Sequence, residues 1–153
     1  MPKLLPIVHE PNPVLRRRAE ALKVSNWDKT ELYKLAEDMI LTMKKAPGVG
    51  LAAPQIGKSI RFIVVERVPD PMILINPEII EHSLLKDTLE EGCLSVPGKY
   101  GLIKRYKSVK VKALTLEGKT VELSAKGFLA EILQHEIDHL NGILYIDKAI
   151  KFV

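Results

Sequence analysis

The sequence predicts an α+β fold in which antiparallel β-sheets pack around a central helix near the carboxyl end, with a long amphipathic helix near the amino end. Two stretches carry apolar residues at helical spacing, and the region between them consists of short β-branched runs separated by turn residues. A chain of 153 residues is of the size that forms one hydrophobic core. We therefore expect a single domain over residues 1–153.

The first helix is predicted to follow Ser25 or Asn26, either of which is a suitable N-cap. Pro47-Gly48 ends the helix, because both residues are unfavourable in a helix interior. The segment is long enough for about five turns. Its apolar residues, which recur every three or four positions, are Leu32, Leu35, Ala36, Met39, Ile40 and Met43.

Strands are predicted between the two helices. Residues 60–65 and 72–75 are rich in β-branched and apolar residues and flank the turn Pro69-Asp70-Pro71, so we expect them to pair. Glu117-Gly118 is typical of a hairpin turn. The further strands predicted in this region cover residues 83–90, 108–115 and 120–123.

A second helix is predicted from about Ser124 to the stop at Asn141-Gly142, and it carries His135, Glu136 and His139. Because positions i and i+4 share one face of a helix, the two histidines can hold one metal ion with the glutamate beside it as a base. Apolar residues precede the motif, so the helix is expected to be buried, and two buried imidazoles without partners would be costly. The pattern therefore indicates the metal centre of a hydrolase.

A third protein ligand is expected, since catalytic zinc-type sites combine three ligands with one open position. None is found after His139, where the only carboxylate is Asp147 and Tyr145 replaces the last histidine of the metzincin pattern. Cys93 is the strongest upstream candidate, because a thiolate binds borderline metals well and Pro97-Gly98 is expected to turn the chain away after it. The other upstream candidates are His9, His82, Glu90 and Glu91.

The bulk properties exclude several classes of function. No apolar run has the length of a membrane span, and the first ten residues are too interrupted by proline for a secretory signal. The formal net charge is +4, but the lysines and arginines are scattered, so we expect no specific nucleic-acid binding. Cys93 is the only cysteine, which excludes an internal disulfide and fits a reducing compartment. We expect a cytoplasmic protein without membrane contact.

Three motifs occur along the chain. Residues 48–55 read Gly-Val-Gly-Leu-Ala-Ala-Pro-Gln, residues 91–95 read Glu-Gly-Cys-Leu-Ser, and residues 135–139 read His-Glu-Ile-Asp-His. Together, and in this order, they closely resemble the motifs of peptide deformylases, which remove the formyl group from the N-terminal methionine of newly made bacterial and organellar proteins. The resemblance extends over nearly the whole chain. It is to bacterial-type enzymes, and an organellar or phage origin is left open.

The resemblance implies that Cys93, His135 and His139 bind one divalent metal ion. It favours ferrous iron in the cell, with zinc, nickel or cobalt able to substitute. It also implies that Glu136 is the general acid and base, which takes the proton of the attacking water and delivers it to the leaving amine.

The resemblance further implies that the side-chain amide of Gln55 and the backbone N–H of Leu94 stabilise the oxyanion. The backbone near Val49 and Gly92 is expected to pair with an extended peptide by strand addition. The residues that the resemblance places around the substrate are Val49, Gly50, Glu91, Gly92, Phe128 and Ile132.

Nascent N-formylmethionyl peptides are the implied substrates, together with transient ribosome association, although many family members continue past Val153 into a longer helix. Glu131, one turn before His135, is charged where a pocket-lining residue is sometimes apolar. Arg105 and Asp138 are expected to pair and to support a ligand imidazole.

Two other functions are compatible with the motifs, namely a metallopeptidase and a catalytically silent metal-binding homologue. Glu136 and Gln55 argue against silence, because neither is needed to hold a metal.

Overall fold

The structure, a computed structural model, describes residues 1–153 except for the side chain of Val24. Its strands are β1 (Gly50–Ala52), β2 (Phe62–Val65), β3 (Met72–His82), β4 (Lys86–Cys93), β5 (Val96–Tyr106), β6 (Ser108–Leu114), β7 (Thr120–Lys126) and β8 (Lys151–Phe152). Its α-helices are α1 (Lys29–Lys45), α2 (Phe128–Leu140) and α3 (Tyr145–Lys148). Short 3-10 helices are η1 (Pro13–Arg16), η2 (Val24–Asn26) and η3 (Ala53–Ile56).

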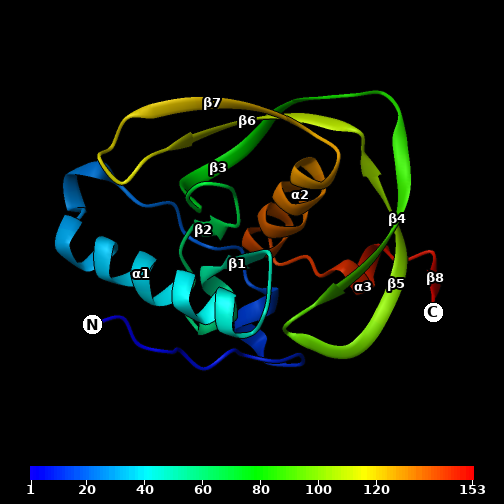
Figure 1. The fold of residues 1–153 in the computed structure, drawn as a ribbon, viewed down its shortest axis with the longest axis horizontal. Coiled ribbons are helices and arrows are strands. Elements are labelled where there is room, and N and C mark those ends of the chain that lie inside the picture. Colours follow the sequence, from blue (N-terminus) through cyan, green and yellow to red (C-terminus); the bar gives the residue numbers. More distant parts are fainter.

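The strands form two antiparallel sheets with α2 between them (Figure 1). One sheet has the strand order β1-β2-β3-β6-β7, and the other has the order β4-β5-β8. The predicted pairing of residues 60–65 with 72–75 is confirmed by the register of Ile63 opposite Leu74. The predicted α+β fold, with antiparallel sheets and a helix near the carboxyl end, is confirmed.

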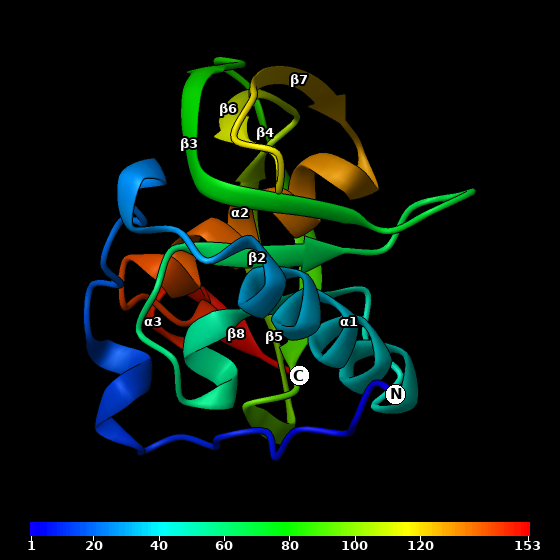
Figure 2. The ribbon, with the colours of Figure 1, turned by 90° about the vertical axis from the view of Figure 1, so that its left-hand side faces the viewer.

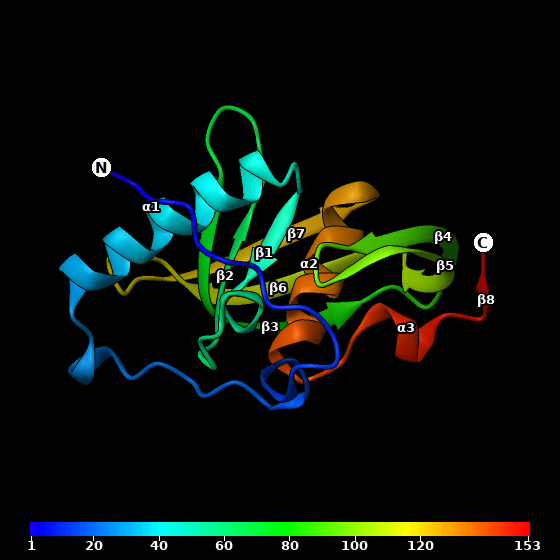
Figure 3. The ribbon, with the colours of Figure 1, turned by 90° about the horizontal axis from the view of Figure 1, so that it is seen from below.

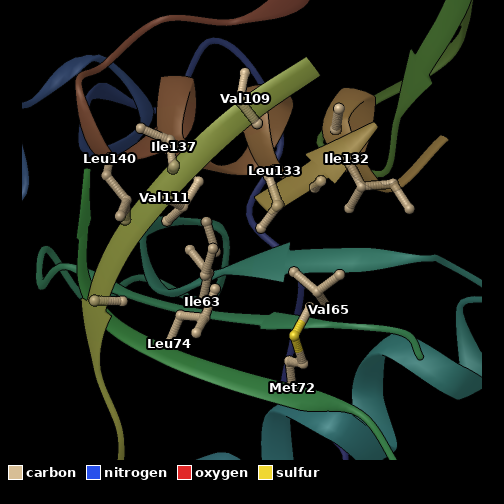
Figure 4. Close-up of a cluster of buried hydrophobic side chains, with 14 of the residues drawn as sticks. Ile63, Val65, Met72, Leu74, Val109, Val111, Ile132, Leu133, Ile137 and Leu140 are labelled. Carbon is tan, nitrogen blue, oxygen red and sulfur yellow. The ribbon is translucent and has the colours of Figure 1, made fainter. Parts of the chain in front are cut away.

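Strand β2 is buried on both faces, which explains why its four residues are all apolar. Ile63 and Val65 pack in one cluster with Leu133 of α2, as Figure 4 shows. Phe62 and Val64 point the other way and pack in a second cluster with α1. The two helices therefore lie on opposite sides of β1 and β2 (Figure 3), and α2 is held against a rigid surface.

Helix α1 begins later than the predicted N-cap at Ser25 or Asn26. The actual N-cap is Asp28, whose carboxylate accepts a hydrogen bond from the backbone N–H of Glu31 at 3.2 Å. Residues 24–26 instead form η2. The prediction was wrong here because Ser25, Asn26 and Asp28 are all good N-cap residues, and the sequence alone does not choose among them.

Helix α2 also begins later than predicted, at Phe128 instead of about Ser124. Strand β7 continues through Lys126, and Ser124 pairs with Lys110 of β6. Gly127 then adopts a φ of 65°, which L side chains rarely adopt, and turns the chain into the helix. Pairing with β6 therefore extends β7 beyond the residues 120–123 that were predicted from their pattern.

The β4–β5 hairpin differs most from the prediction. Its two-residue turn lies at Leu94 and Ser95, since Cys93 pairs with Val96, so Pro97-Gly98 belongs to β5 and does not turn the chain away. Strand β4 starts at residue 86 instead of 83. Strand β5 was not predicted, because its first half contains proline and two glycines and depends on pairing with β4.

The amino-terminal segment runs along one side of the molecule past α1 and η3 (Figure 2). The backbone N–H of Lys3 donates to Asp38 and that of Leu5 to Thr42, both on α1, while the N–H of Val8 donates to the carbonyl of Gln55 at 2.7 Å. Among the described residues, no helix combines the length and apolar character needed to cross a bilayer.

Candidate metal centre

Three potential metal ligands converge from two elements that lie far apart in the sequence. Cys93 ends strand β4, and His135 and His139 lie one turn apart on α2. Their ligand atoms all lie within 4.8 Å of one another, and the Cys93 Sγ is 3.3 Å from the His139 Nε2. One thiolate and two imidazoles suit a borderline divalent metal such as iron, zinc, nickel or cobalt. The donor set therefore fits a metal ion.

The His135 ring is oriented by a network of charged side chains, most of which are buried. Its Nδ1 lies 2.8 Å from Glu91 Oε1, which leaves Nε2 free for a metal. Arg105 donates to both oxygens of Glu91, at 2.8 and 2.9 Å, and to Asp138 Oδ2 at 2.7 Å. The Nζ of Lys148 forms an ion pair with Asp138 Oδ2 at 3.1 Å. The expected pairing of Arg105 with Asp138 is confirmed, and Glu91 is the link between this pair and the imidazole.

This network shifts the pKa values of Glu91 and His135. Burial alone would raise the pKa of Glu91, but hydrogen bonds from Arg105 and His135 lower it to about 2. Burial alone would lower the pKa of His135, but hydrogen bonds with Cys93 and Glu91 raise it above its ordinary value. Glu91 therefore carries a full negative charge that holds the His135 Nδ1–H and turns Nε2 towards Cys93.

Glu136 has the environment of a general base. Burial raises its pKa to about 7, which is close to the pH at which such a group must both accept and release a proton. Within the described part of the chain, its Oε1 is buried and has no hydrogen-bond partner. Gly50 provides the space for this carboxylate, since a Cβ on Gly50 would lie 2.6 Å from Glu136 Oε2.

The Gln55 amide is held in one orientation beside the three potential ligands. Its Oε1 accepts the backbone N–H of Ala52 at 2.9 Å, and its Nε2 donates to Ser95 Oγ at 3.1 Å and approaches Cys93 Sγ at 3.6 Å. A flipped amide would place its NH₂ against the Ala52 N–H, so the donor end must face the ligands. Gln55 is buried, so its amide is shielded from water.

Sequence reasoning missed three residues that support the site. Ser95 fixes Gln55, as described, and Gln134 joins α2 to β5 by hydrogen bonds to the backbone N–H and carbonyl of Tyr106, at 2.9 and 3.0 Å. Arg61 donates to the carbonyl of Leu140 at the end of α2, at 2.9 Å. The Glu-Gly-Cys-Leu-Ser motif was a signal for Ser95, but no local pattern marks the other two.

A cleft of about 630 Å³ opens onto these residues. His9 and Glu90, weighed as possible ligands, line the cleft outside the ligand group, and His82 stacks on Tyr106 instead. Leu94 also lines the cleft. The predicted substrate residues all line it, namely Val49, Gly50, Glu91, Gly92, Phe128 and Ile132.

Comparisons with known proteins agree with this geometry. The sequence profile of the family described as polypeptide deformylase matches residues 4–152. A peptide deformylase from Halothermothrix orenii is 51% identical over 146 residues, which cover 92% of this chain and 90% of that protein. A crystal structure of the class I type b peptide deformylase from Acinetobacter baumannii superposes with a TM-score of 0.92 at 42% identity, covering 95% of this chain and 99% of the other. A structure of the Acinetobacter enzyme with Met-Ala-Ser bound gives a TM-score of 0.91 at 40% identity, covering 97% and 99%.

Proposed function

The chain belongs to the polypeptide deformylase family, and we propose that residues 1–153 form one catalytic domain whose metal ligands are Cys93, His135 and His139. The enzyme is a hydrolase that removes the formyl group from the N-terminus of nascent polypeptides. The observation that carries the ligand assignment is the convergence of the three side chains, two of which, Cys93 and His135, line the cleft.

A metal ion held by Cys93, His135 and His139 would supply a Lewis acid, which can polarise the formyl carbonyl and lower the pKa of water towards neutral pH. The Cys93 thiolate offsets part of the ion's charge, and Glu91 keeps the His135 ring in the tautomer that binds through Nε2. We propose ferrous iron as the metal in the cell, with zinc, nickel or cobalt as substitutes.

Glu136 moves the proton. With a pKa of about 7, its carboxylate accepts a proton from the attacking water and then delivers it to the amine that leaves. Formate and a free amino terminus are the products. The unpartnered Oε1 supports this role, because a buried acceptor with no partner in the protein is available to the reacting water.

Gln55 and Leu94 stabilise the negative oxygen that develops on the formyl group. The Gln55 Nε2 keeps one hydrogen on Ser95 and can exchange its longer contact with Cys93 Sγ for the oxyanion. The backbone N–H of Leu94 follows the ligand Cys93 directly and lies in the tight turn of the β4–β5 hairpin. Both donors are neutral and preorganised, which is the arrangement that stabilises a transition state.

The substrate is proposed to bind as an added strand. Strand β1 is at the edge of its sheet, and its residue Gly50 lines the cleft together with Val49 and Gly92. An extended peptide can pair with this edge while its methionine side chain enters the apolar slot at Phe128 and Ile132. The Met-Ala-Ser bound to the Acinetobacter enzyme supports this kind of occupancy. We also propose that the enzyme acts in the cytoplasm and associates transiently with the ribosome.

Formate release from formyl-Met-Ala-Ser tests the function, with unformylated Met-Ala-Ser as the comparison. We expect formate from the first peptide and no free amino acids from the second; amino acids without formate would indicate a metallopeptidase. We expect Glu136→Ala to abolish turnover while the metal content stays the same. Full activity in that variant would mean that another residue moves the proton.

A further inference from the structure

Glu131 places a carboxyl group in the wall of the substrate slot. It lies on α2 between Phe128 and His135, it is partly buried, and it lines the same cleft as the apolar residues Phe128 and Ile132. A slot that had to accept only the thioether of methionine would gain nothing from an acid there, because the thioether is at best a weak hydrogen-bond acceptor.

Glu131 has no cationic partner among the described residues. The neighbouring Glu91 is already bonded to Arg105 and His135, so its charge is compensated. Glu131 instead faces Glu91 itself. Burial and then the hydrogen bond and like charge of Glu91 raise the pKa of Glu131 to about 7, against weaker opposing effects of Arg105 and His135. An acid in this position costs stability, since burial and the like charge of Glu91 outweigh the nearby positive charges.

The rest of the cleft does not offer such a group to the first side chain of a substrate. Glu136 is committed to proton transfer, and Glu90 is exposed, so water screens its charge. The basic residues His9 and Lys99 are also exposed. Glu131 is therefore the one acid of the described cleft that is partly shielded from water, lies beside the apolar slot and has neither a salt bridge nor a proposed chemical role.

We infer that Glu131 is a specificity-determining residue that binds an N–H donor at the end of the substrate's first side chain, so that the slot accepts formylated glutamine and lysine besides methionine. This inference rests on the proposed function of the slot. Glutamine and lysine reach about as far as methionine and end in donors, and a charged acceptor strengthens such a hydrogen bond. A side chain of the same length without a donor, such as norleucine, gains nothing from Glu131.

The test measures kcat/KM for formate release from formyl-Xaa-Ala-Ser, with methionine, norleucine, glutamine or lysine at the first position. We expect Glu131→Leu to lower kcat/KM for the glutamine and lysine peptides by about 10- to 100-fold, relative to the methionine and norleucine peptides. Glu131→Gln keeps an acceptor but loses the charge, so the lysine peptide should suffer more than the glutamine peptide. Glu90→Leu removes an exposed acid of the same cleft and should change all four values by the same small factor.

An equal fall for all four peptides in Glu131→Leu, or no change in any, would overturn the inference. Calorimetric titration of the product tripeptides Met-Ala-Ser and Lys-Ala-Ser keeps the test independent of turnover. We expect Glu131→Leu to weaken only the binding of the lysine product, and equal changes for both products would also contradict the inference. Failure of the wild-type protein to release formate from the methionine peptide would instead refute the proposed function.

Discussion

Replacement of Arg105 by methionine should destabilise the protein and weaken the metal site together. Arg105 is one of the largest fully buried side chains, and it donates to both oxygens of Glu91 and to Asp138. Methionine fills a similar volume but leaves Glu91 as a buried charge with only His135 beside it. Breaking a buried ion pair by removing one partner costs about 3 to 5 kcal/mol.

The lowered pKa of Glu91 gives an independent magnitude. The interval between about 2 in the folded protein and the ordinary 4.5 corresponds to about 3 kcal/mol, since one pH unit is worth about 1.4 kcal/mol. Because the folded pKa is lowered, this stabilisation is present above about pH 4.5 and is lost as the pH falls towards 2. The difference in stability between the wild type and Arg105→Met should therefore shrink over that interval.

Urea unfolding of the metal-free proteins from pH 7 to pH 2.5 measures the stability, and titration with zinc at pH 7 measures the metal site. We expect zinc affinity to fall by about 10- to 100-fold in Arg105→Met, because Glu91 no longer holds the His135 ring firmly. Lys148→Met is the matched control, since it removes an exposed cation from Asp138 and should cost less than about 1 kcal/mol. Equal stability of the two variants, or an unchanged zinc affinity of Arg105→Met, would contradict the supporting role of Arg105.

Three further predictions concern the centre itself. Gly50→Ala should lower kcat at least about tenfold with metal content unchanged, because the new Cβ would displace the Glu136 carboxylate. Steady-state kinetics together with metal analysis test this, and a normal kcat would contradict it. Ser95→Ala should lower kcat about tenfold with little change in KM, and Ser95→Thr should retain part of the wild-type kcat. When Gln55→Ala is already present, Ser95→Ala should lower kcat no further. Equal losses of kcat in both backgrounds would show that the hydroxyl acts independently of the amide. Cys93→Ser should bind iron or zinc more weakly and lose most activity, which elemental analysis after dialysis can check; a variant with full metal content and rate would mean that another residue completes the ligand set.

Local sequence patterns predicted those parts of the fold whose cause is local. Helical spacing identified the segment that carries His135 and His139, and β-branched residues around a proline turn identified the β2–β3 pair. Boundaries were less accurate where tertiary pairing extends an element, as at Ser124 in β7. Strand β5 was missed for the same reason, since its first residues form a strand only beside β4.

The site could be predicted only as far as chemistry restricts residue type. A metal needs particular donors, so Cys93 could be chosen from the few candidates upstream of the helix. The supporting groups are ordinary polar residues whose roles depend on position alone. Nothing in the sequence around Arg61 indicates that it holds the carbonyl of Leu140, and nothing around Gln134 indicates that it joins α2 to β5.

The contacts that build the site join segments that lie far apart in the sequence. Gln55 and Ser95 are separated by 40 residues, Cys93 and His139 by 46, and Arg61 and Leu140 by 79. Domains emerge during synthesis from the amino end, and contacts of such separation form only after both partners are available. The proposed ligand set therefore cannot close until α2 has left the ribosome. A copy whose synthesis stops before α2 lacks the proposed ligands His135 and His139, so it cannot process other new chains.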